Sequence, residues 1–246
     1  MPSSLGRVWK HNIRPYVPFP KQKTLKRWFP PYHDRNVAHL INLHRVDLVL
    51  DVGANTGQYA RRLRAAGYKG RILSFEPLLE AWTQAAAQAA ADPLWDMAPP
   101  MALDAESGTK TLNVCRDTSL TSLQNPIEGV GPAGLAVERT ETVQCHSLDD
   151  AAADALAKAQ RPFLKIDVQG FEKPVIAGAE ETLKRCVGVQ IELSLDPLYE
   201  GEPGYLEMLG DLEARGFHLA FMLPVVSKLK LGPMDQVDGL LFRREG

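Results

Sequence analysis

The chain has 246 residues, of which 45% are hydrophobic and 24% are charged, and its formal net charge is −2. These values are ordinary for a soluble globular domain, and the length is sufficient to bury one large core. The three cysteines lie far apart without a C-x-x-C spacing, which indicates neither a disulfide framework nor a zinc site. No apolar run approaches the roughly 18 residues that cross a bilayer, and no signal peptide is visible, so we expect a cytoplasmic protein.

Positive charge is concentrated at the start of the chain. Residues 1–33 hold seven Lys and Arg residues and no acidic residue, together with several aromatic residues and prolines. Proline at this density prevents a single amphipathic helix. We predict that residues 1–40 form an arm or lid over the acidic domain of 41–246, or over a neighbouring subunit of a homo-oligomer. A peripheral contact with an anionic membrane or a lipid-linked substrate is the alternative. The acidic remainder argues against nucleic-acid binding.

A glycine-rich turn follows the first apolar run. A strand is predicted at 46–50 and a helix from 58 to about 66, and between them stands Asp51-Val52-Gly53-Ala54-Asn55-Thr56-Gly57. Strand, glycine turn and helix in this order form a small-molecule cradle. The acidic residue precedes the first glycine, unlike the G-x-G-x-x-G of dinucleotide binders, and suits a ligand that carries positive charge. S-adenosylmethionine meets both conditions, while a purely structural turn is the alternative.

The second predicted strand also ends on an acidic residue. Arg71–Phe75 is followed by Glu76 and by Pro77, which lacks an N–H and ends the strand. An acid about 20 positions beyond a glycine turn is where a nucleoside ribose is held through its hydroxyls. We predict this role for Glu76; stabilisation of a helix N-terminus is the alternative.

The middle of the chain predicts a helix at 80–91, a third strand within 95–103 and an inserted β-pair at 109–114 and 140–145. The pair is joined by residues 117–136, a long loop of the kind that often serves as a functional lid. Within it, Ser119-Leu120-Thr121-Ser122 is a candidate substrate contact, with simple turn chemistry as the alternative.

Two further strands place charges near their carboxyl ends. Phe163-Leu164-Lys165-Ile166-Asp167 begins as a strand that breaks at Gly170, and strand 188–193 contains Glu192. Lys165 and Asp167 share one face, where charges are costly unless they are paired or used. Helices are predicted at 149–159, 174–185 and 205–215, and an antiparallel pair at 217–223 and 239–243.

Several of these segments, in this order, resemble the FkbM-type S-adenosylmethionine-dependent O-methyltransferases. The similar segments are DVGANTGQYA, SFEP, Ala102-Leu103-Asp104, Ser147–Asp150 and LKIDVQGFEKPVIAGAEETL. The resemblance implies an α/β fold of the class I methyltransferase (Rossmann-like) type. Such a fold has a seven-stranded, mostly parallel sheet with helices on both faces and a terminal antiparallel hairpin. The family usually has glutamate where this chain has Gln169.

The carboxyl ends of parallel strands meet at one edge of a sheet, so the acidic residues should border one crevice. We predict that Asp51 organises the turn near the methionine portion of S-adenosylmethionine, that Glu76 binds the ribose, and that Leu103 and Asp104 lie near the adenine. The full set of predicted cofactor contacts is Asp51, Gly53, Asn55, Gly57, Tyr59, Glu76, Pro77, Leu103 and Asp104.

Lys165, Asp167 and Glu192 are the predicted catalytic residues. Methyl transfer to oxygen is an in-line displacement in which the acceptor hydroxyl loses its proton. In one mechanism Asp167 or Glu192 is the general base and Lys165 tunes it. In the other, Asp167 and Glu192 bind Mg²⁺, which lowers the pKa of the coordinated hydroxyl.

The resemblance implies a hydroxyl acceptor on a sugar of a glycolipid, polysaccharide or glycosylated natural product, with a polyketide hydroxyl as the alternative. An NAD(P)-dependent oxidoreductase is disfavoured because the chain has no G-x-G-x-x-G and no evident Tyr-x-x-x-Lys pair. A non-catalytic cofactor-binding or scaffold protein, working through its basic arm, is the third hypothesis.

Overall fold

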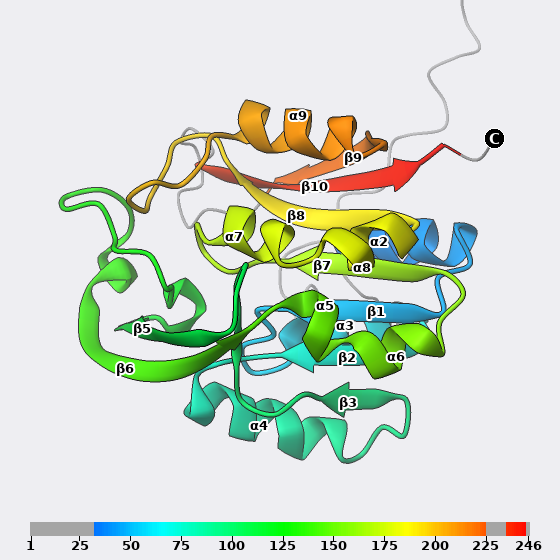
Figure 1. The fold of residues 1–246 in the computed structure, drawn as a ribbon, viewed down its shortest axis with the longest axis horizontal. Coiled ribbons are helices and arrows are strands. Elements are labelled where there is room, and N and C mark those ends of the chain that lie inside the picture. Colours follow the sequence, from blue (N-terminus) through cyan, green and yellow to red (C-terminus); the bar gives the residue numbers. More distant parts are fainter. Residues whose placement is uncertain (1–31, 225–234, 245–246) are drawn as a thin grey trace, which may run out of the picture.

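The computed structural model describes residues 32–224 and 235–244, which form a seven-stranded sheet and a three-stranded sheet (Figure 1). The order of the large sheet is β3-β2-β1-β7-β8-β10-β9. Its strands are β1 (Leu48–Val52), β2 (Arg71–Phe75), β3 (Trp95–Met97), β7 (Pro162–Ile166), β8 (Gly188–Ser194), β9 (Phe217–Pro224) and β10 (Gln236–Arg243). The first five of these pair in parallel, and β10 is antiparallel to both β8 and β9. The predicted mostly parallel sheet with a terminal antiparallel hairpin is confirmed.

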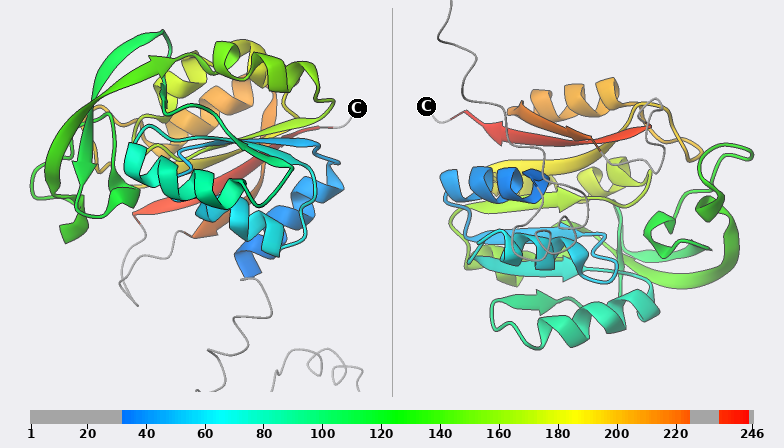
Figure 2. Two further views of the ribbon diagram at one scale, coloured as in Figure 1. Left: turned by 90° about the horizontal axis from the view of Figure 1, so that it is seen from below. Right: turned by 180° about the vertical axis from the view of Figure 1, so that it is seen from behind.

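Helices cover both faces of this sheet (Figure 2). One face carries α2 (Tyr32–Leu43), α3 (Gln58–Ala65) and α4 (Leu79–Ala89). The other carries α5 (Leu148–Ala151), α6 (Ala153–Ala157), α7 (Glu172–Ala177), α8 (Glu180–Arg185) and α9 (Tyr205–Ala214). Helix α2 spans the boundary that the sequence predicts at residue 40. The rest of the predicted basic arm, residues 1–31, lies outside the described residues.

The alternation of side chains along β1 assigns its residues to two cores. Leu48, Leu50 and Val52 pack in the core beneath α5–α9, whereas Val49 belongs to the core beneath α2 and α3. Since successive side chains point to opposite faces, Asp51 lies on the same face as Val49. The strand is longer than predicted at its carboxyl end and includes Asp51.

Two helices that the sequence predicts as continuous are each interrupted. The predicted helix 149–159 is α5 and α6, and the predicted helix 174–185 is α7 and α8. In the second case the break falls at Gly178, which packs against the backbone of Asp104; a Cβ at Gly178 would lie 2.0 Å from the Asp104 carbonyl oxygen. Tertiary packing therefore overrides the helical pattern at this position.

The small sheet is inserted between β3 and β7 and consists of β4 (Ala102–Leu103), β5 (Gly108–Cys115) and β6 (Val137–His146). Strands β5 and β6 are antiparallel and correspond to the predicted inserted pair. The range 95–103, which was predicted to contain the third strand, holds β3, which joins the large sheet, and also β4, which joins the small one. The loop between β5 and β6 contains two short 3₁₀ turns, η2 (Thr118–Leu120) and η3 (Ala133–Leu135).

We expect Gly178→Ala to destabilise the fold by about 2 kcal/mol or more, because its methyl group would collide with backbone. The matched control is Gly210→Ala inside α9, where a Cβ has no neighbour within 4 Å. That change should stabilise the protein by about 0.5–1 kcal/mol through helix propensity. Urea unfolding of both variants measures the difference; equal midpoints would contradict the packing argument.

Candidate active site

The glycine turn after β1 has a backbone that only glycine accommodates at two positions. Gly53 and Gly57 have φ angles of 77° and 78°. A Cβ on Gly53 would lie 1.8 Å from the Asp167 carbonyl oxygen, and one on Gly57 would lie 2.6 Å from the Trp95 ring. The turn therefore packs tightly against the segment that follows β7 and against β3.

Glu76 joins this turn to the end of β2. Its Oε2 accepts the Asn55 N–H at 2.7 Å and its Oε1 accepts the Leu78 N–H at 2.9 Å. The side chain is buried, and burial raises the pKa of Glu76 to about 7 against the opposing effect of these two hydrogen bonds. Each carboxylate oxygen keeps a further lone pair, so Glu76 can accept hydrogen bonds from a ligand.

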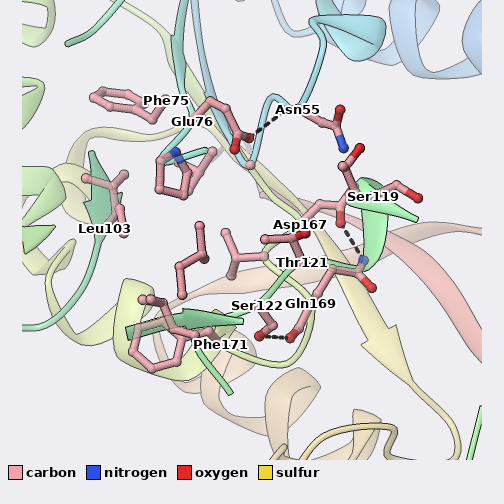
Figure 3. Close-up of a pocket in the computed structure, with 18 of the residues that line it drawn as sticks. Asn55, Phe75, Glu76, Leu103, Ser119, Thr121, Ser122, Asp167, Gln169 and Phe171 are labelled. Carbon is pink, nitrogen blue, oxygen red and sulfur yellow. Dashed lines mark hydrogen bonds between the residues drawn. The ribbon is translucent and has the colours of Figure 1, made fainter. Parts of the chain in front are cut away.

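A cavity of about 680 Å³, open to solvent, lies over the ends of β1, β2 and β7 (Figure 3). Its polar side is formed by Gly53, Asn55, Glu76 and Asp167, and its apolar side by Phe75, Met101, Leu103 and Phe171. A lining of apolar side chains with a few polar groups is typical of small-molecule sites. We call this cavity the first cavity.

Five of the predicted cofactor contacts line the first cavity: Gly53, Asn55, Glu76, Pro77 and Leu103. The predicted loop contacts Ser119, Thr121 and Ser122 line it as well. Gln169 and Phe171 also line it, and neither is among the site residues predicted from the sequence.

Four predicted cofactor contacts lie away from the first cavity. Asp51 is fully buried inside the sheet, Gly57 packs on Trp95, and Tyr59 donates its hydroxyl to Gln190 Oε1 at 2.8 Å. Asp104 forms an ion pair with Lys110 at 2.6 Å beside a separate, shallow cavity. These four residues are not part of the lining of the first cavity, and their contact with a cofactor stays a prediction.

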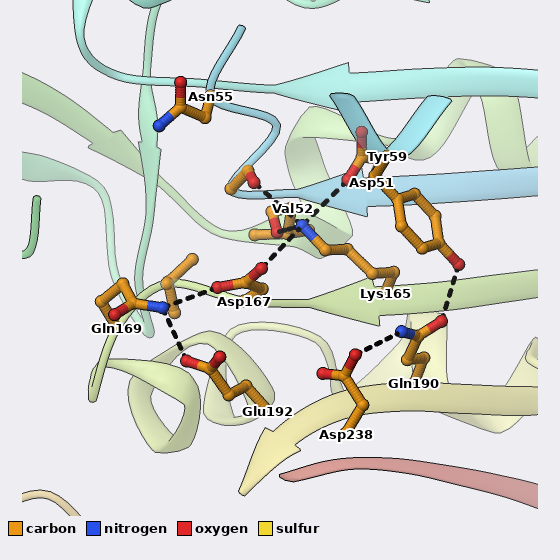
Figure 4. Close-up of polar contacts among 12 residues, drawn as sticks. Asp51, Val52, Asn55, Tyr59, Lys165, Asp167, Gln169, Gln190, Glu192 and Asp238 are labelled. Atoms are coloured by element: carbon orange, nitrogen blue, oxygen red, sulfur yellow. Dashed lines mark hydrogen bonds and ion pairs between the residues drawn. The ribbon is translucent and has the colours of Figure 1, made fainter. Parts of the chain in front are cut away.

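A row of polar side chains crosses four neighbouring strands on the α2–α3 face of the sheet, and Figure 4 shows three of its members, Asp51, Lys165 and Gln190. Ser74, Asp51, Lys165 and Gln190 are register neighbours on β2, β1, β7 and β8, and all four are buried. Ser74 Oγ donates to Asp51 Oδ2 at 2.9 Å, and the Lys165 ammonium lies 3.1 Å from Asp51 Oδ1. We call these four residues the polar row.

Lys165 connects the polar row to the glycine turn. Its ammonium donates to the carbonyl oxygens of Val52 at 3.1 Å and Gly53 at 2.9 Å, and lies 3.7 Å from Asp167 Oδ2. Burial lowers the pKa of Lys165, but the charges of Asp51 and Asp167 outweigh burial, so the net shift is upward. The Lys165 ammonium therefore binds the glycine turn through these two carbonyl oxygens.

Gln169 connects the two predicted catalytic acids. Its Nε2 donates to Asp167 Oδ1 at 2.9 Å and to Glu192 Oε2 at 2.6 Å, while its Oε1 accepts the Tyr199 hydroxyl at 3.2 Å. The residue has a φ of 57°, and Ser122 Oγ donates to its carbonyl oxygen at 2.6 Å. The signal for Gln169 in the sequence is its departure from the glutamate that is usual in the similar family.

The two acids differ in their surroundings. Burial, followed by the charges of Asp167 and Asp238, raises the pKa of Glu192 well above its ordinary value. The Asp167 side chain is 38% exposed, and Asp167 lines the first cavity. Of the two, Asp167 is thus the one whose side chain is open both to the first cavity and to solvent.

The hydrogen-bond donors around Asp167 and Glu192 are not compatible with a metal ion bound between these two side chains. The amide of Gln169 occupies the space between Asp167 and Glu192, and its two N–H groups satisfy one oxygen of each. Among the residues that the structure describes, no three His, Cys, Asp or Glu side chains are grouped to hold a metal. The predicted Mg²⁺ pair is therefore a hydrogen-bonded pair here.

No helix in residues 32–224 or 235–244 combines the length and apolar character that crossing a membrane requires.

The fold is similar to that of several solved structures. An O-methyltransferase from Bacillus cereus in complex with SAH is 13% identical, with 92% of this chain and 94% of that chain covered and a TM-score of 0.50. The magnesium protoporphyrin IX methyltransferase from Synechocystis PCC 6803 with bound SAM is 11% identical, with 94% and 86% covered and a TM-score of 0.46. A chain of a fibrillarin/Nop5p complex is 14% identical, with 88% and 84% covered and a TM-score of 0.48. No curated protein sequence matches the chain.

The sheet order, the glycine turn and the first of these similarities define a protein with the class I methyltransferase fold. The family model for the methyltransferase FkbM domain matches residues 51–219. The chain belongs to this family of methyltransferases, as its sequence resemblance implied.

We expect Lys165→Met to destabilise the protein by about 3–5 kcal/mol, because it leaves the buried Asp51 without a cation. Adding Asp51→Asn should recover part of the loss, since the uncompensated charge is then gone. The control Lys158→Met, at an exposed position, should change stability little. Denaturant unfolding measures all three, and a single variant as stable as the control would refute the role of the ion pair.

Proposed function

We propose that this chain is an S-adenosylmethionine-dependent O-methyltransferase with its cofactor in the first cavity. The observation that carries the proposal is Glu76, a buried carboxylate at the end of β2 with acceptor capacity left over at the cavity. Ribose hydroxyls are suitable donors to such a group. The apolar side around Leu103 and Phe171 suits an adenine ring, and the side at Gly53 and Asp167 suits the methionine portion.

When bound, S-adenosylmethionine supplies an electrophilic methyl group on a positively charged sulfur. Asp167 takes the proton of the acceptor hydroxyl while a new carbon–oxygen bond forms and the carbon–sulfur bond breaks. Gln169 fixes the orientation of Asp167 through Oδ1, and Lys165 lies near its Oδ2. The exposed side of Asp167 then returns the proton to water. The products are a methyl ether, S-adenosylhomocysteine and a proton.

We propose that the reaction does not use Mg²⁺. The hydrogen bonds of Gln169 to both acids support this, because a metal ion at that place would face the amide N–H groups. We therefore derive no step through a metal.

The proposed acceptor is a hydroxyl of a sugar. The resemblance to sugar-modifying members of the family suggests it, and the polar groups around Asp167 are consistent with it. A polyketide hydroxyl is the alternative within the family. We propose no nucleic-acid partner.

The cofactor proposal predicts that the protein binds S-adenosylhomocysteine and that affinity falls as the pH drops from 8 to 6. Because the pKa of Glu76 is raised to about 7, protonation in this window removes the acceptor for the ribose. Glu76→Ala should weaken binding by about ten- to hundredfold, and Glu76→Gln should abolish the pH dependence. Calorimetric titration measures the affinities.

The matched control is Glu80→Gln, an exposed change nearby in α4 that should leave affinity and its pH dependence unchanged. NAD⁺ and NADP⁺ serve as ligand controls. Failure of the folded wild-type protein to bind either S-adenosylmethionine or S-adenosylhomocysteine would refute the proposed function.

Asp167→Asn should reduce the rate of methyl transfer by about 10²–10⁴-fold, the usual contribution of a general base. Its affinity for S-adenosylhomocysteine should stay within about threefold of wild type, since the amide keeps the shape of the side chain. The rate is measured as transfer of a radiolabelled methyl group to glycan acceptors, with and without a chelator. Undiminished transfer in Asp167→Asn would exclude this residue as the base, and loss of transfer on chelation would restore the metal mechanism.

A further inference from the structure

A second, larger cavity of about 1,120 Å³ lies on the sheet face covered by α2 and α3. It meets the first cavity at three residues, since Gly53, Gln58 and Asp167 line both. The proposed function uses one of these cavities for the cofactor and leaves the second cavity without a role.

We propose that the second cavity binds the methyl acceptor and that it takes an uncharged, polyhydroxylated ring such as a glycosyl unit. The inference rests on the proposed function and adds the place, the contacts and the charge of the acceptor. Three observations carry it: the position of Asp167, the unused hydrogen-bond acceptors of the cavity, and the pairing of its charges.

The first observation is the position of Asp167. Asp167 is the proposed base, and its side chain stands where the two cavities meet. An acceptor hydroxyl that enters from the second cavity therefore reaches Asp167 at the place where this cavity meets the methyl-donor side of the first cavity. In-line transfer requires such an arrangement, with donor and acceptor on opposite sides of the methyl group.

The second observation is a set of acceptors without donors. Asp238 Oδ2 accepts the Gln190 Nε2–H at 3.2 Å, and the Tyr59 hydroxyl fixes the orientation of that amide at Oε1. Within the described residues no donor contacts Asp238 Oδ1. Asp34 pairs with Arg62 at 3.5 Å through Oδ1, whereas its Oδ2 is buried and has no hydrogen-bond partner among those same residues. Neighbouring sugar hydroxyls are donors that such carboxylates accept.

The third observation concerns charge and shape. The arginine and the lysine of the cavity are already paired, Arg62 with Asp34 and Lys165 with Asp51. An anionic acceptor would therefore have to compete with a protein carboxylate. The Tyr59 ring faces the Lys165 ammonium at 5.4 Å, so this ring face is not free to stack on a flat aromatic acceptor. Aliphatic side chains, among them Val37 and Leu223, complete the wall and can contact the C–H groups of a sugar ring.

The test uses the full-length protein saturated with S-adenosylhomocysteine. Methyl glycosides of glucose, mannose, galactose and rhamnose are the probes at tens of millimolar, with catechol as a flat aromatic comparison. Saturation-transfer NMR detects binding, and titration gives the affinity. The variants are Asp238→Asn and Asp34→Asn, and the control is Asp96→Asn, an exposed change on β3 outside both cavities.

We expect at least one glycoside to bind wild type and Asp96→Asn equally, and to bind Asp238→Asn and Asp34→Asn about tenfold more weakly. The affinity for S-adenosylhomocysteine should be the same in all four proteins. The inference is overturned if no glycoside binds, if catechol alone binds, or if the two variants bind glycosides as wild type does. It is also overturned if the variants lose S-adenosylhomocysteine affinity, which would assign the second cavity to the methionine portion. If wild type does not bind S-adenosylhomocysteine at all, the proposed function has failed, and not this inference alone.

Discussion

The ion pair between Asp51 and Lys165 is the interaction on which the site depends. Both charges are buried in the sheet, where neither would be tolerated without the other. The same ammonium binds the carbonyl oxygens of Val52 and Gly53, so the pair also sets the path of the backbone into the glycine turn. Glu76 then holds the far side of that turn through the Asn55 N–H. The shape of the first cavity thus depends in part on an ion pair whose two residues do not line it.

The two faces of the large sheet carry different kinds of side chain. On the α5–α9 face, β1, β7 and β8 present only aliphatic side chains to a continuous core. On the α2–α3 face, these strands present Asp51, Lys165, Gln190 and Glu192, while Asp167 follows the end of β7 and Asp238 stands on the neighbouring β10. Stability and chemistry are therefore supplied by alternate residues of the same strands. A one-residue shift of register would exchange the two sets.

The order of the helices and strands, the glycine turn, and the positions of Glu76 and Asp167 at strand ends could be predicted from the sequence. Local sequence patterns and the ends of strands determine these features. The sequence was not sufficient to predict the burial of Asp51, since whether a side chain points into a cavity or into the sheet depends on where the strand ends. The break at Gly178 depends on a contact with Asp104, more than 70 positions earlier. Gln169 stood out in the sequence only because the similar family usually has glutamate at this position. Its hydrogen-bond partners Glu192 and Tyr199 come from segments that are distant in the sequence.

Residue 169 has a consequence for how such sites diverge. Glutamine and glutamate codons differ by a single nucleotide, yet the exchange would replace an amide that donates to two carboxylates with a third carboxylate among them. Three acids within hydrogen-bond distance must share protons or recruit a cation. A point mutation at this position would therefore convert an amide that bridges Asp167 and Glu192 into a third carboxylate beside them. The backbone φ of 57° and the contacts of Ser122 and Tyr199 would hold either side chain in the same place.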